Sequence, residues 1–317
     1  MTSLPTENPL FKLLEQRVNP SHLKQRLGIE LDREQKIFSQ GPNFFHIENW
    51  YSIHAFIRNT LRLSLLHRRG QKNALDLQVT QNTLTLPQLP DAFEGYRILH
   101  ISDLHIDVND KIPLVLADTI SKLEYDLCVI TGDLRARTFG PYHDALDAMK
   151  VVRNRITTPV YAVLGNHDTI QMVPGLEAMG IDVLLNESVM IEKAGQSLYL
   201  SGIDDPHYYE AHNIEKASHD IPGDSTSILL SHSPEPYQHA AHAGFDVFLC
   251  GHTHGGQICL PGGIPLMRNA RCPRKFCNGS WDFHNMQGYT SKGSGVSVVD
   301  VRYNCPPEIT LHTLQKS

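Results

Sequence analysis

Residues 245–256 read FDVFLCGHTHGG, a short apolar run followed by two histidines set between glycines. The run from Phe245 to Cys250 has the length of a buried strand, which places His252 and His254 on the turn at its carboxyl end. Residues i and i+2 of an extended segment point the same way, and open α/β sheets bind ligands at this edge. The stretch therefore predicts an α/β fold with one site that both histidines share. In a chain with 18 histidines, two ordinary loop histidines are the alternative.

Earlier parts of the chain repeat this arrangement. Apolar runs at residues 97–102, 127–131 and 160–164 alternate with helical patterns at residues 113–124 and 141–154, which is typical of βαβ units and a partly parallel sheet. In the second half, residues 188–200 read as a hairpin, and residues 227–230, 296–301 and 309–314 read as strands. The strand ends carry Asp103, His105, Asp133, Asn166, His167, Asp168 and His232.

Polar side chains from five strand ends are thus expected to converge at one edge. They offer carboxylate oxygen, amide oxygen and imidazole nitrogen, which suit manganese, iron and zinc. Because they are too many for a single ion, two ions that share a carboxylate fit better. Two ions about 3.5–4 Å apart can clamp the attacking and leaving oxygens of a displacement at phosphorus, and they lower the pKa of a bridging water.

In this order, Asp-x-His, Gly-Asp, Gly-Asn-His-Asp, a lone His after a strand and Gly-His-x-His resemble the signature of the calcineurin-like metallophosphoesterases, over residues 96–315. The runs at residues 203–206, 255–263 and 304–308 are similar to a bacterial subgroup of membrane- or wall-associated phosphodiesterases. That subgroup resembles enzymes that cleave the pyrophosphate of UDP-2,3-diacylglucosamine. The resemblance implies a four-layer α/β/β/α sandwich of two mixed sheets at residues 91–317, behind a helical extension and linker at residues 1–90.

The resemblance also implies a role for each site residue. Asp103, His105 and His254 would hold the first ion, and Asn166, His232 and His252 would hold the second. Asp133 would bridge the two ions, and His167 would be the general acid or leaving-group stabiliser. The implied cofactors are two divalent or trivalent ions of manganese, iron or zinc, and the implied reaction is hydrolysis of phosphodiesters or pyrophosphates by in-line attack of a bridging hydroxide.

One position departs from the family pattern. Many relatives carry Gly-Asp-x-x-Asp-Arg, in which the second Asp orients the His of Gly-Asn-His, but this chain has Ala136 there and keeps Arg137. Asp168 is a candidate replacement for the missing carboxylate. Arg137 is the expected phosphate clamp, because a guanidinium matches phosphate in bidentate fashion, and Arg135 is the second choice. Solvated loop charges are the alternative for both arginines.

The N-terminal region is expected to be helical up to about residue 70. Apolar residues at helical spacing between Ile47 and Leu65, with Arg58, Arg62 and later basic residues beside them, indicate either a helix packed on the catalytic domain or a basic amphipathic helix on a membrane surface. The possible membrane contact covers residues 47–72. With no signal peptide or membrane-spanning run in this sequence, a cytoplasmic location is expected, with peripheral contact at the inner membrane face.

Several other features admit two interpretations. The basic cluster at residues 268–275 is either a solvated loop or a contact for phosphate or membrane, and His207 either lines a substrate groove or caps a helix. A net charge of -6 predicts no nucleic-acid partner. A non-catalytic interaction module on the same fold is the alternative to a hydrolase, but every ligand position holds a competent residue. A soluble phosphoester and a lipid-linked one both remain possible substrates.

Overall fold

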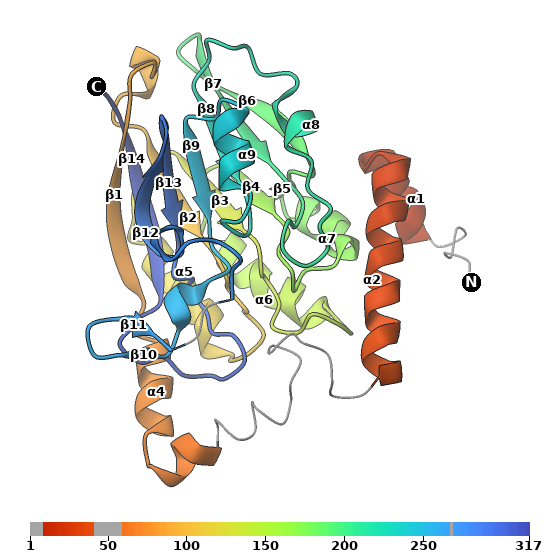
Figure 1. The fold of residues 1–317 in the computed structure, drawn as a ribbon, viewed down its shortest axis with the longest axis vertical. Coiled ribbons are helices and arrows are strands. Elements are labelled where there is room, and N and C mark those ends of the chain that lie inside the picture. Colours follow the sequence, from red (N-terminus) through yellow and green to blue (C-terminus); the bar gives the residue numbers. More distant parts are fainter. Residues whose placement is uncertain (1–8, 41–58, 267–268) are drawn as a thin grey trace.

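The computed structural model describes residues 9–40, 59–266 and 269–317, which form two six-stranded sheets packed face to face (Figure 1). The first sheet has the order β1 (Gln78–Leu86), β14 (Glu308–Lys316), β2 (Arg97–Ile101), β3 (Leu127–Thr131), β4 (Val160–Val163) and β5 (Asp182–Val183). The second has the order β12 (Gly279–Phe283), β13 (Met286–Thr290), β9 (Val247–Cys250), β8 (Ser227–Leu230), β7 (Gln196–Gly202) and β6 (Glu187–Lys193). Both are mixed, with parallel central strands and antiparallel pairs at β14–β2, β12–β13 and β6–β7.

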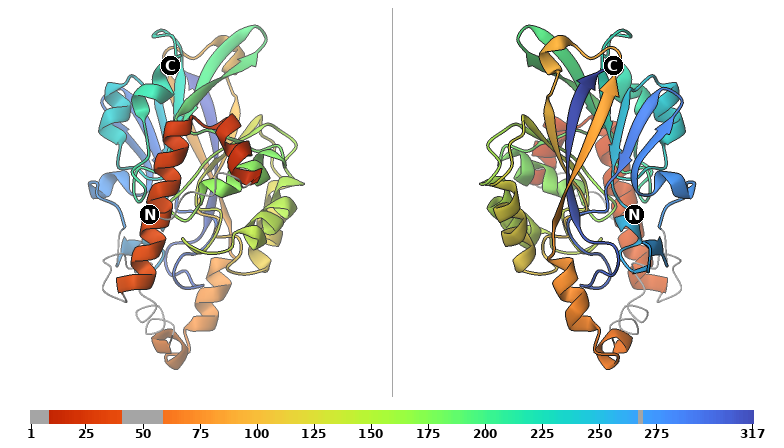
Figure 2. Two further views of the ribbon diagram at one scale, coloured as in Figure 1. Left: turned by 90° about the vertical axis from the view of Figure 1, so that its right-hand side faces the viewer. Right: turned by 90° about the vertical axis from the view of Figure 1, so that its left-hand side faces the viewer.

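Helices cover the outer face of each sheet (Figure 2). Those on the first sheet are α5 (Lys111–Ile120), α6 (His143–Arg153) and α7 (Val173–Glu177), and those on the second are α8 (Ile214–Ser218) and α9 (Tyr237–His242). Short 3-10 turns are η3 (Asp91–Phe93), η4 (Ile170–Met172), η5 (His254–Gly256) and η6 (Arg274–Phe276). The expected four-layer α/β/β/α sandwich is therefore confirmed.

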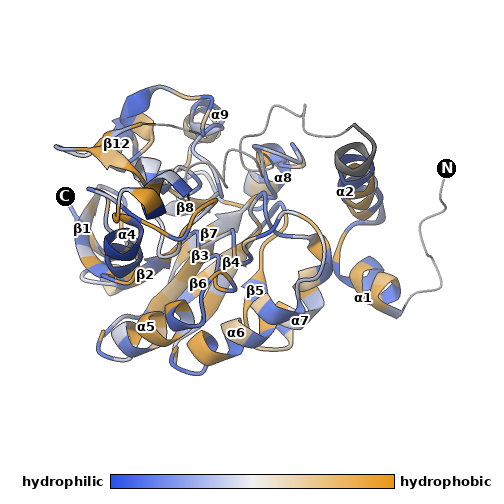
Figure 3. Ribbon diagram, turned by 90° about the horizontal axis from the view of Figure 1, so that it is seen from below, coloured by the Kyte–Doolittle hydropathy of each residue, from blue (hydrophilic) through white to orange (hydrophobic). Residues whose placement is uncertain are grey.

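The central strands are buried on both faces, as their continuous apolar composition requires. Along β3, Val129 belongs to the core between the sheets, whereas Cys128 and Ile130 belong to the core under α5 and α6. This alternation follows the two-residue period of a strand. Figure 3 shows hydrophobic residues concentrated on the strands between the two helical layers.

Most strands and helices lie where the sequence predicts them, but one does not. The expected strand at residues 296–301 is wrong, because this stretch is an irregular loop. Its backbone carbonyls at Ser297 and Val299 accept hydrogen bonds of 2.8 and 2.9 Å from the side-chain amide of Gln257. The segment is therefore held by the loop that follows the Gly-His-x-His motif and does not pair with a strand.

The first sheet begins before residue 91. The edge strand β1 pairs in parallel with β14 over its whole length, so part of the expected linker belongs to the sandwich. The short hairpin of β10 (Cys259–Leu260) and β11 (Ile264–Pro265) follows η5 directly and was absent from the predicted elements.

The N-terminal region is helical where it is described. Helices α1 (Pro9–Arg17) and α2 (Pro20–Gln40) lie along the edge of the sandwich formed by β5 and β6, and Phe11, Leu14 and Leu23 belong to the core on the outer face of the first sheet (Figure 2). Helix α4 (His67–Ala74) leads into β1. The predicted amphipathic stripe falls largely on residues 41–58, which lie outside the described residues. Within the described helices, none is both long and apolar enough to cross a bilayer.

Candidate metal centre

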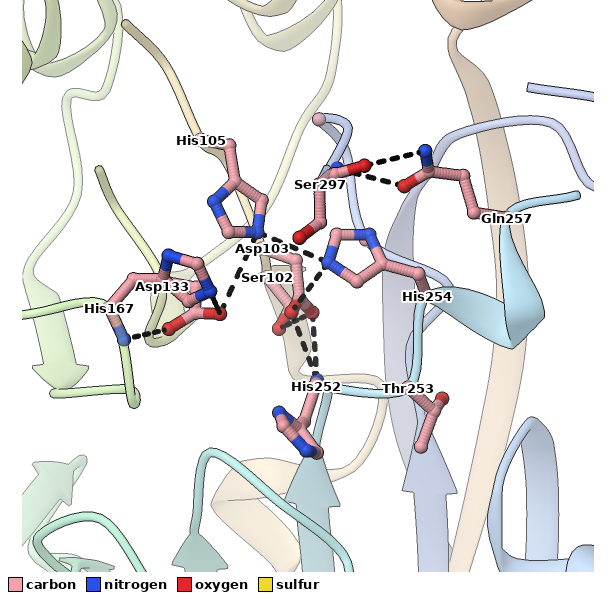
Figure 4. A network of polar contacts seen from close by, with 12 residues as sticks. Ser102, Asp103, His105, Asp133, His167, His252, Thr253, His254, Gln257 and Ser297 are labelled. Carbon is pink, nitrogen blue, oxygen red and sulfur yellow. Dashed lines mark hydrogen bonds and ion pairs between the residues drawn. The ribbon is translucent and has the colours of Figure 1, made fainter. Parts of the chain in front are cut away.

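The predicted ligands meet at the carboxyl ends of five strands from both sheets. Strands β2, β3 and β4 are parallel, so the loops after them open at one edge, and β8 and β9 open toward the same place from the second sheet (Figure 4). Five ligand residues have positive φ, which is uncommon outside glycine: Asp103 (50°), His105 (39°), Asp133 (54°), His252 (71°) and His254 (50°). Backbone strain of this kind clusters at functional sites, where the surrounding structure maintains it.

The first ligand group consists of Asp103, His105 and His254, whose ligand atoms lie within 4.8 Å of one another. All three residues are buried. The two Nε2 atoms are 3.1 Å apart, and the Nε2 of His254 is 3.4 Å from a carboxylate oxygen of Asp103. Two imidazole nitrogens and a carboxylate that face a common point form a donor set suited to a transition-metal ion.

The second group consists of Asp133, His232 and His252, also within 4.8 Å of one another. The Nε2 of His232 lies 2.9 Å from the amide oxygen of Asn166, 3.3 Å from Asp133 and 3.1 Å from the Nδ1 of His252. The same Asp133 oxygen, Oδ2, is 3.6 Å from the Nε2 of His105 in the first group. Asp133 therefore lies between the two groups, as a bridging carboxylate would.

Backbone contacts present the imidazole nitrogens of both groups in a fixed way. The Nδ1–H of His105 donates to the carbonyl of Arg135 at 2.9 Å, and the Nδ1–H of His232 donates to that of Thr131 at 2.8 Å. Each bond fixes the tautomer and leaves the Nε2 lone pair directed into the site, an arrangement usual for metal-binding histidines. The carboxylate of Asp103 also accepts a hydrogen bond of 2.6 Å from the Ser102 hydroxyl.

The protonation states of these groups fit metal binding. Burial lowers the pKa of His105 to about 4 and lowers the pKa values of His252 and His254 well below their usual range, so these imidazoles are neutral near pH 7. Although burial opposes it, the Asp133 carboxylate raises the pKa of His232. Burial raises the pKa of Asp103 to about 6. A cation would replace the proton that His232 otherwise retains and would balance the buried carboxylate of Asp103, so the residues present fit a metal pair.

The ring of His167 is held by a backbone carbonyl. Its Nδ1–H donates to the carbonyl oxygen of Ala136 at 2.7 Å, and its Nε2 lies 4.0 Å from Asp133. The carboxylate of Asp168 instead accepts hydrogen bonds from the backbone amides of Leu134 and Gly165, both at 2.9 Å. The expectation that Asp168 replaces the missing carboxylate is therefore wrong: Asp168 joins two ligand-bearing loops, and the carbonyl of Ala136 orients His167.

The two candidate phosphate-binding arginines have different surroundings. Arg135 is buried and donates to the carbonyls of His167, Thr138 and Gly140, so its guanidinium is occupied in holding the loop. Arg137 is exposed and forms no hydrogen bond or salt bridge with the part of the chain that is described. Arg137 thus remains the candidate for phosphate contact, and Arg135 does not.

Two further side chains, which the sequence does not place at the centre, lie directly behind the ligands. Arg302 is fully buried, with its Nη2 3.3 Å from the Nδ1 of His254 and 2.7 Å from the carbonyl of Gly295. The ring of His207 lies 4.1 Å from the ring of His252, and its Nδ1 is 2.8 Å from Glu235. The sequence marks His207 as a candidate groove residue, but no local pattern distinguishes Arg302.

The helix α2 also contacts the site through a buried arginine. Arg26 donates to the carbonyl of Asp168 at 3.0 Å and lies 3.2 Å from Asp204 and 2.9 Å from Glu30. Glu30 in turn accepts hydrogen bonds from the Thr169 hydroxyl at 2.6 Å and from the amide of residue 170 at 2.9 Å. This helix therefore holds the segment that directly follows His167.

Comparison with known proteins agrees with this geometry. The sequence profile of the calcineurin-like phosphoesterases matches residues 96–256, which contain all seven predicted metal ligands and His167. The chain belongs to this family. Its members depend on two metal ions, and the protein is accordingly a metal-dependent phosphoester hydrolase.

Relatives cover most of the chain. The uncharacterized metallophosphoesterase YkoQ of Bacillus subtilis (strain 168) is 29% identical over 78% of this chain and 93% of its own length. The phosphodiesterase YaeI of Escherichia coli (strain K12) is 26% identical over 68% of this chain and 81% of its own length. Among solved structures, the calcineurin-like phosphoesterase YfkN from Bacillus subtilis aligns with a TM-score of 0.41 at 16% identity, over 64% of this chain and 82% of that one.

Proposed function

We propose that the protein hydrolyses phosphodiesters or pyrophosphates at a dinuclear metal centre. The observation that supports this most directly is the position of Asp133, with one carboxylate oxygen 3.6 Å from His105 and 3.3 Å from His232. Asp103, His105 and His254 would hold one ion, and Asn166, His232 and His252 would hold the other. Two bound ions would neutralise charge on the phosphoryl group and lower the pKa of a water.

The remaining site residues would act on the substrate. His167 presents its Nε2 toward the centre while Nδ1 is held by Ala136, so it suits proton donation to a leaving oxygen. Arg137 would contact the non-bridging oxygens of the phosphoryl group. Asp168, by contrast, would act only by keeping the loops of His167 and Asp133 in register.

Two classes of natural substrate fit this proposal. The name of YaeI and the motifs at residues 203–206 and 255–263 favour a phosphodiester, and the likeness of that bacterial subgroup to enzymes that cleave UDP-2,3-diacylglucosamine supports a lipid-precursor pyrophosphate. Every metal-ligand position of the family holds a residue that can bind a metal, which argues against a non-catalytic module. Peripheral contact with the inner membrane face through residues 47–72 stays part of the proposal, although residues 47–58 lie outside the described ranges.

One experiment tests both the centre and the substrate class. Protein stripped of metal is supplied with manganese, iron, cobalt, zinc or magnesium and assayed on phosphomonoesters, phosphodiesters and UDP-2,3-diacylglucosamine. Elemental analysis of protein purified without chelator is expected to find two transition-metal ions per chain, in line with the two ligand groups. Metal content near zero that no added ion restores would contradict the dinuclear proposal.

A further inference from the structure

We infer that one end of the molecule, beside the metal centre, is a docking surface for an anionic lipid bilayer. Two segments form this surface: residues 63–66, hereafter the leucine tip, and the β10–β11 hairpin with Leu266. The inference rests on the proposed function and deepens its membrane contact, because it names the surface and the lipid that would present a phosphoester next to the centre.

Exposed apolar side chains are concentrated on these two segments. Eleven large hydrophobic residues of the described chain are exposed, and six of them lie here. They are Leu63 (86% exposed), Leu65 (87%), Leu66 (41%), Leu260 (48%), Ile264 (47%) and Leu266 (58%). Single exposed leucines are normal on a soluble surface, but a grouping of this kind marks an interaction site.

The backbone conformation of Leu65 indicates that its side chain has a role other than packing within the protein. Leu65 has a φ of 59°, a left-handed conformation that glycine or asparagine adopts at lower energy at the end of a helical turn. A leucine at this position packs against little of the protein, since it is 87% exposed. Neither the turn nor the core therefore explains why an apolar residue stands there.

Tyr303 contacts both segments and so joins them. The hydroxyl of Tyr303 donates to the carbonyl of Leu66, and the carbonyl of Tyr303 accepts a hydrogen bond of 2.9 Å from the amide of Cys259 in β10. Helix α4, which follows the leucine tip, and the hairpin lie at the same end of the molecule in both orientations (Figures 1 and 2). Both apolar segments therefore rest on the same stretch of chain.

This stretch also reaches the metal centre. Arg302, next to Tyr303, has its guanidinium 3.3 Å from the imidazole of His254, and β10 begins five residues after His254 in the sequence. A bilayer that binds the leucine tip and the hairpin would thus contact segments that are joined by hydrogen bonds to the loop of His252 and His254.

The charges around the leucines select an anionic partner. Residues 59–75 and 257–281 contain no Asp or Glu, although the whole chain has 34 acidic residues and a net charge of -6. The described basic residues of these segments that are exposed include Arg62, Arg68, Arg69, Lys72, Arg274 and Lys275. Leucines at loop ends with lysines and arginines beside them match a bilayer of anionic lipid, which offers hydrocarbon beneath a layer of phosphate groups.

The test measures co-sedimentation of the full chain with vesicles, with residues 41–58 left unchanged in every variant. Wild-type protein is expected to pellet with vesicles that contain phosphatidylglycerol, to pellet less as salt rises, and to remain in solution with phosphatidylcholine alone. Replacing the leucine tip by glutamine at Leu63, Leu65 and Leu66 should lower the bound fraction about tenfold or more. The hairpin variant, with Leu260→Gln, Ile264→Gln and Leu266→Gln, should show a similar loss.

A control variant removes three apolar residues elsewhere whose exposure matches that of the hairpin residues. Leu13→Gln, Leu114→Gln and Met190→Gln replace side chains that are 53%, 59% and 55% exposed, and vesicle binding should be unchanged. Equal losses in the control, retained binding in the tip or hairpin variant, or no wild-type binding to anionic vesicles would each overturn the inference. Hydrolysis of soluble bis(p-nitrophenyl) phosphate and of detergent-solubilised UDP-2,3-diacylglucosamine is measured in parallel: the absence of both activities in metal-loaded wild type would refute the proposed function and would leave the vesicle result interpretable.

Discussion

Two clusters of buried charged side chains contact the loop at residues 165–168, and they differ in how their charges are balanced. At the metal centre, Asp133 accepts a hydrogen bond of 2.9 Å from the amide of His167, and the salt bridges of its carboxylate within the described chain are all with imidazoles. At the second cluster, Arg26 donates to the carbonyl of Asp168, and its guanidinium lies against Asp204 and Glu30.

The second cluster, which we call the Arg26 cluster, is complete within the protein. Burial alone would raise the pKa of Asp204, but the charge of Arg26 and the hydrogen bond from His22 lower it to about 2, so the carboxylate is ionised and paired. The pKa of Asp103 at the metal centre is instead raised by burial to about 6. A buried charge without a partner is costly, so the metal centre needs cations from outside the chain whereas the Arg26 cluster does not. The contrast separates a binding site from a structural clamp.

The strongest test of this comparison removes the bridging carboxylate. Asp133→Asn should lower kcat by several orders of magnitude, because one carboxylate serves both ligand groups. The fold should survive, since the residue lies in a loop at a strand end. Steady-state kinetics and elemental analysis of the folded variant measure the effect. Retention of more than about a tenth of wild-type kcat would show that Asp133 does not bridge two ions.

Removal of the expected proton donor should have the next largest effect. His167→Ala should lower kcat by about 10²–10⁴-fold, as is typical of general acid–base groups, while metal content stays near that of the wild type. The loss should be smaller for nitrophenolate esters, whose leaving groups need little protonation. An equal loss for good and poor leaving groups would indicate that His167 positions phosphate and donates no proton.

A mutation in the Arg26 cluster should lower the stability of the protein and leave its metal content unchanged. Arg26→Met removes the buried guanidinium from the carboxylates of Asp204 and Glu30, which should cost about 3–5 kcal/mol in the free energy of unfolding measured by urea denaturation. Arg17→Met is the matched control, because Arg17 also pairs with two carboxylates, those of Glu177 and Glu187, but is 30% exposed, and its loss should cost about 1 kcal/mol or less. Equal losses in the two variants, or a loss of metal from folded Arg26→Met protein, would contradict the separation of the two clusters.

The smallest effect is expected at the position that departs from the family pattern. Since the carbonyl of Ala136 already accepts the hydrogen bond from Nδ1 of His167, Ala136→Asp should change kcat by less than about threefold, or ~0.6 kcal/mol in the activation free energy. The measurement is kcat on one phosphodiester with saturating metal. A rise of tenfold or more would show that the carbonyl is an inadequate substitute for the carboxylate.

Local sequence patterns predicted much of the sandwich. Strands β3 and β8 occupy the predicted residues 127–131 and 227–230, because continuous apolar runs bounded by turns are buried strands in parallel sheets. The expected strand at residues 296–301 is wrong because this stretch is itself a loop. Its apolar residues are buried without strand pairing, and two of its backbone carbonyls accept hydrogen bonds from Gln257. Side-chain satisfaction of this kind depends on a partner about 40 residues away and leaves no local signal.

By itself, the sequence determined the chemical types of the ligands and their order after successive apolar runs. Parallel strands align their carboxyl ends, so these two properties suffice to predict one convergent site. The tertiary structure decided what lies behind that site: Arg302 beside His254, His207 against His252, and Arg26 on the loop of His167. The partners in the last pair are 142 residues apart, and contacts at such separations follow from the packing of the whole core, which no pattern of neighbouring residues specifies.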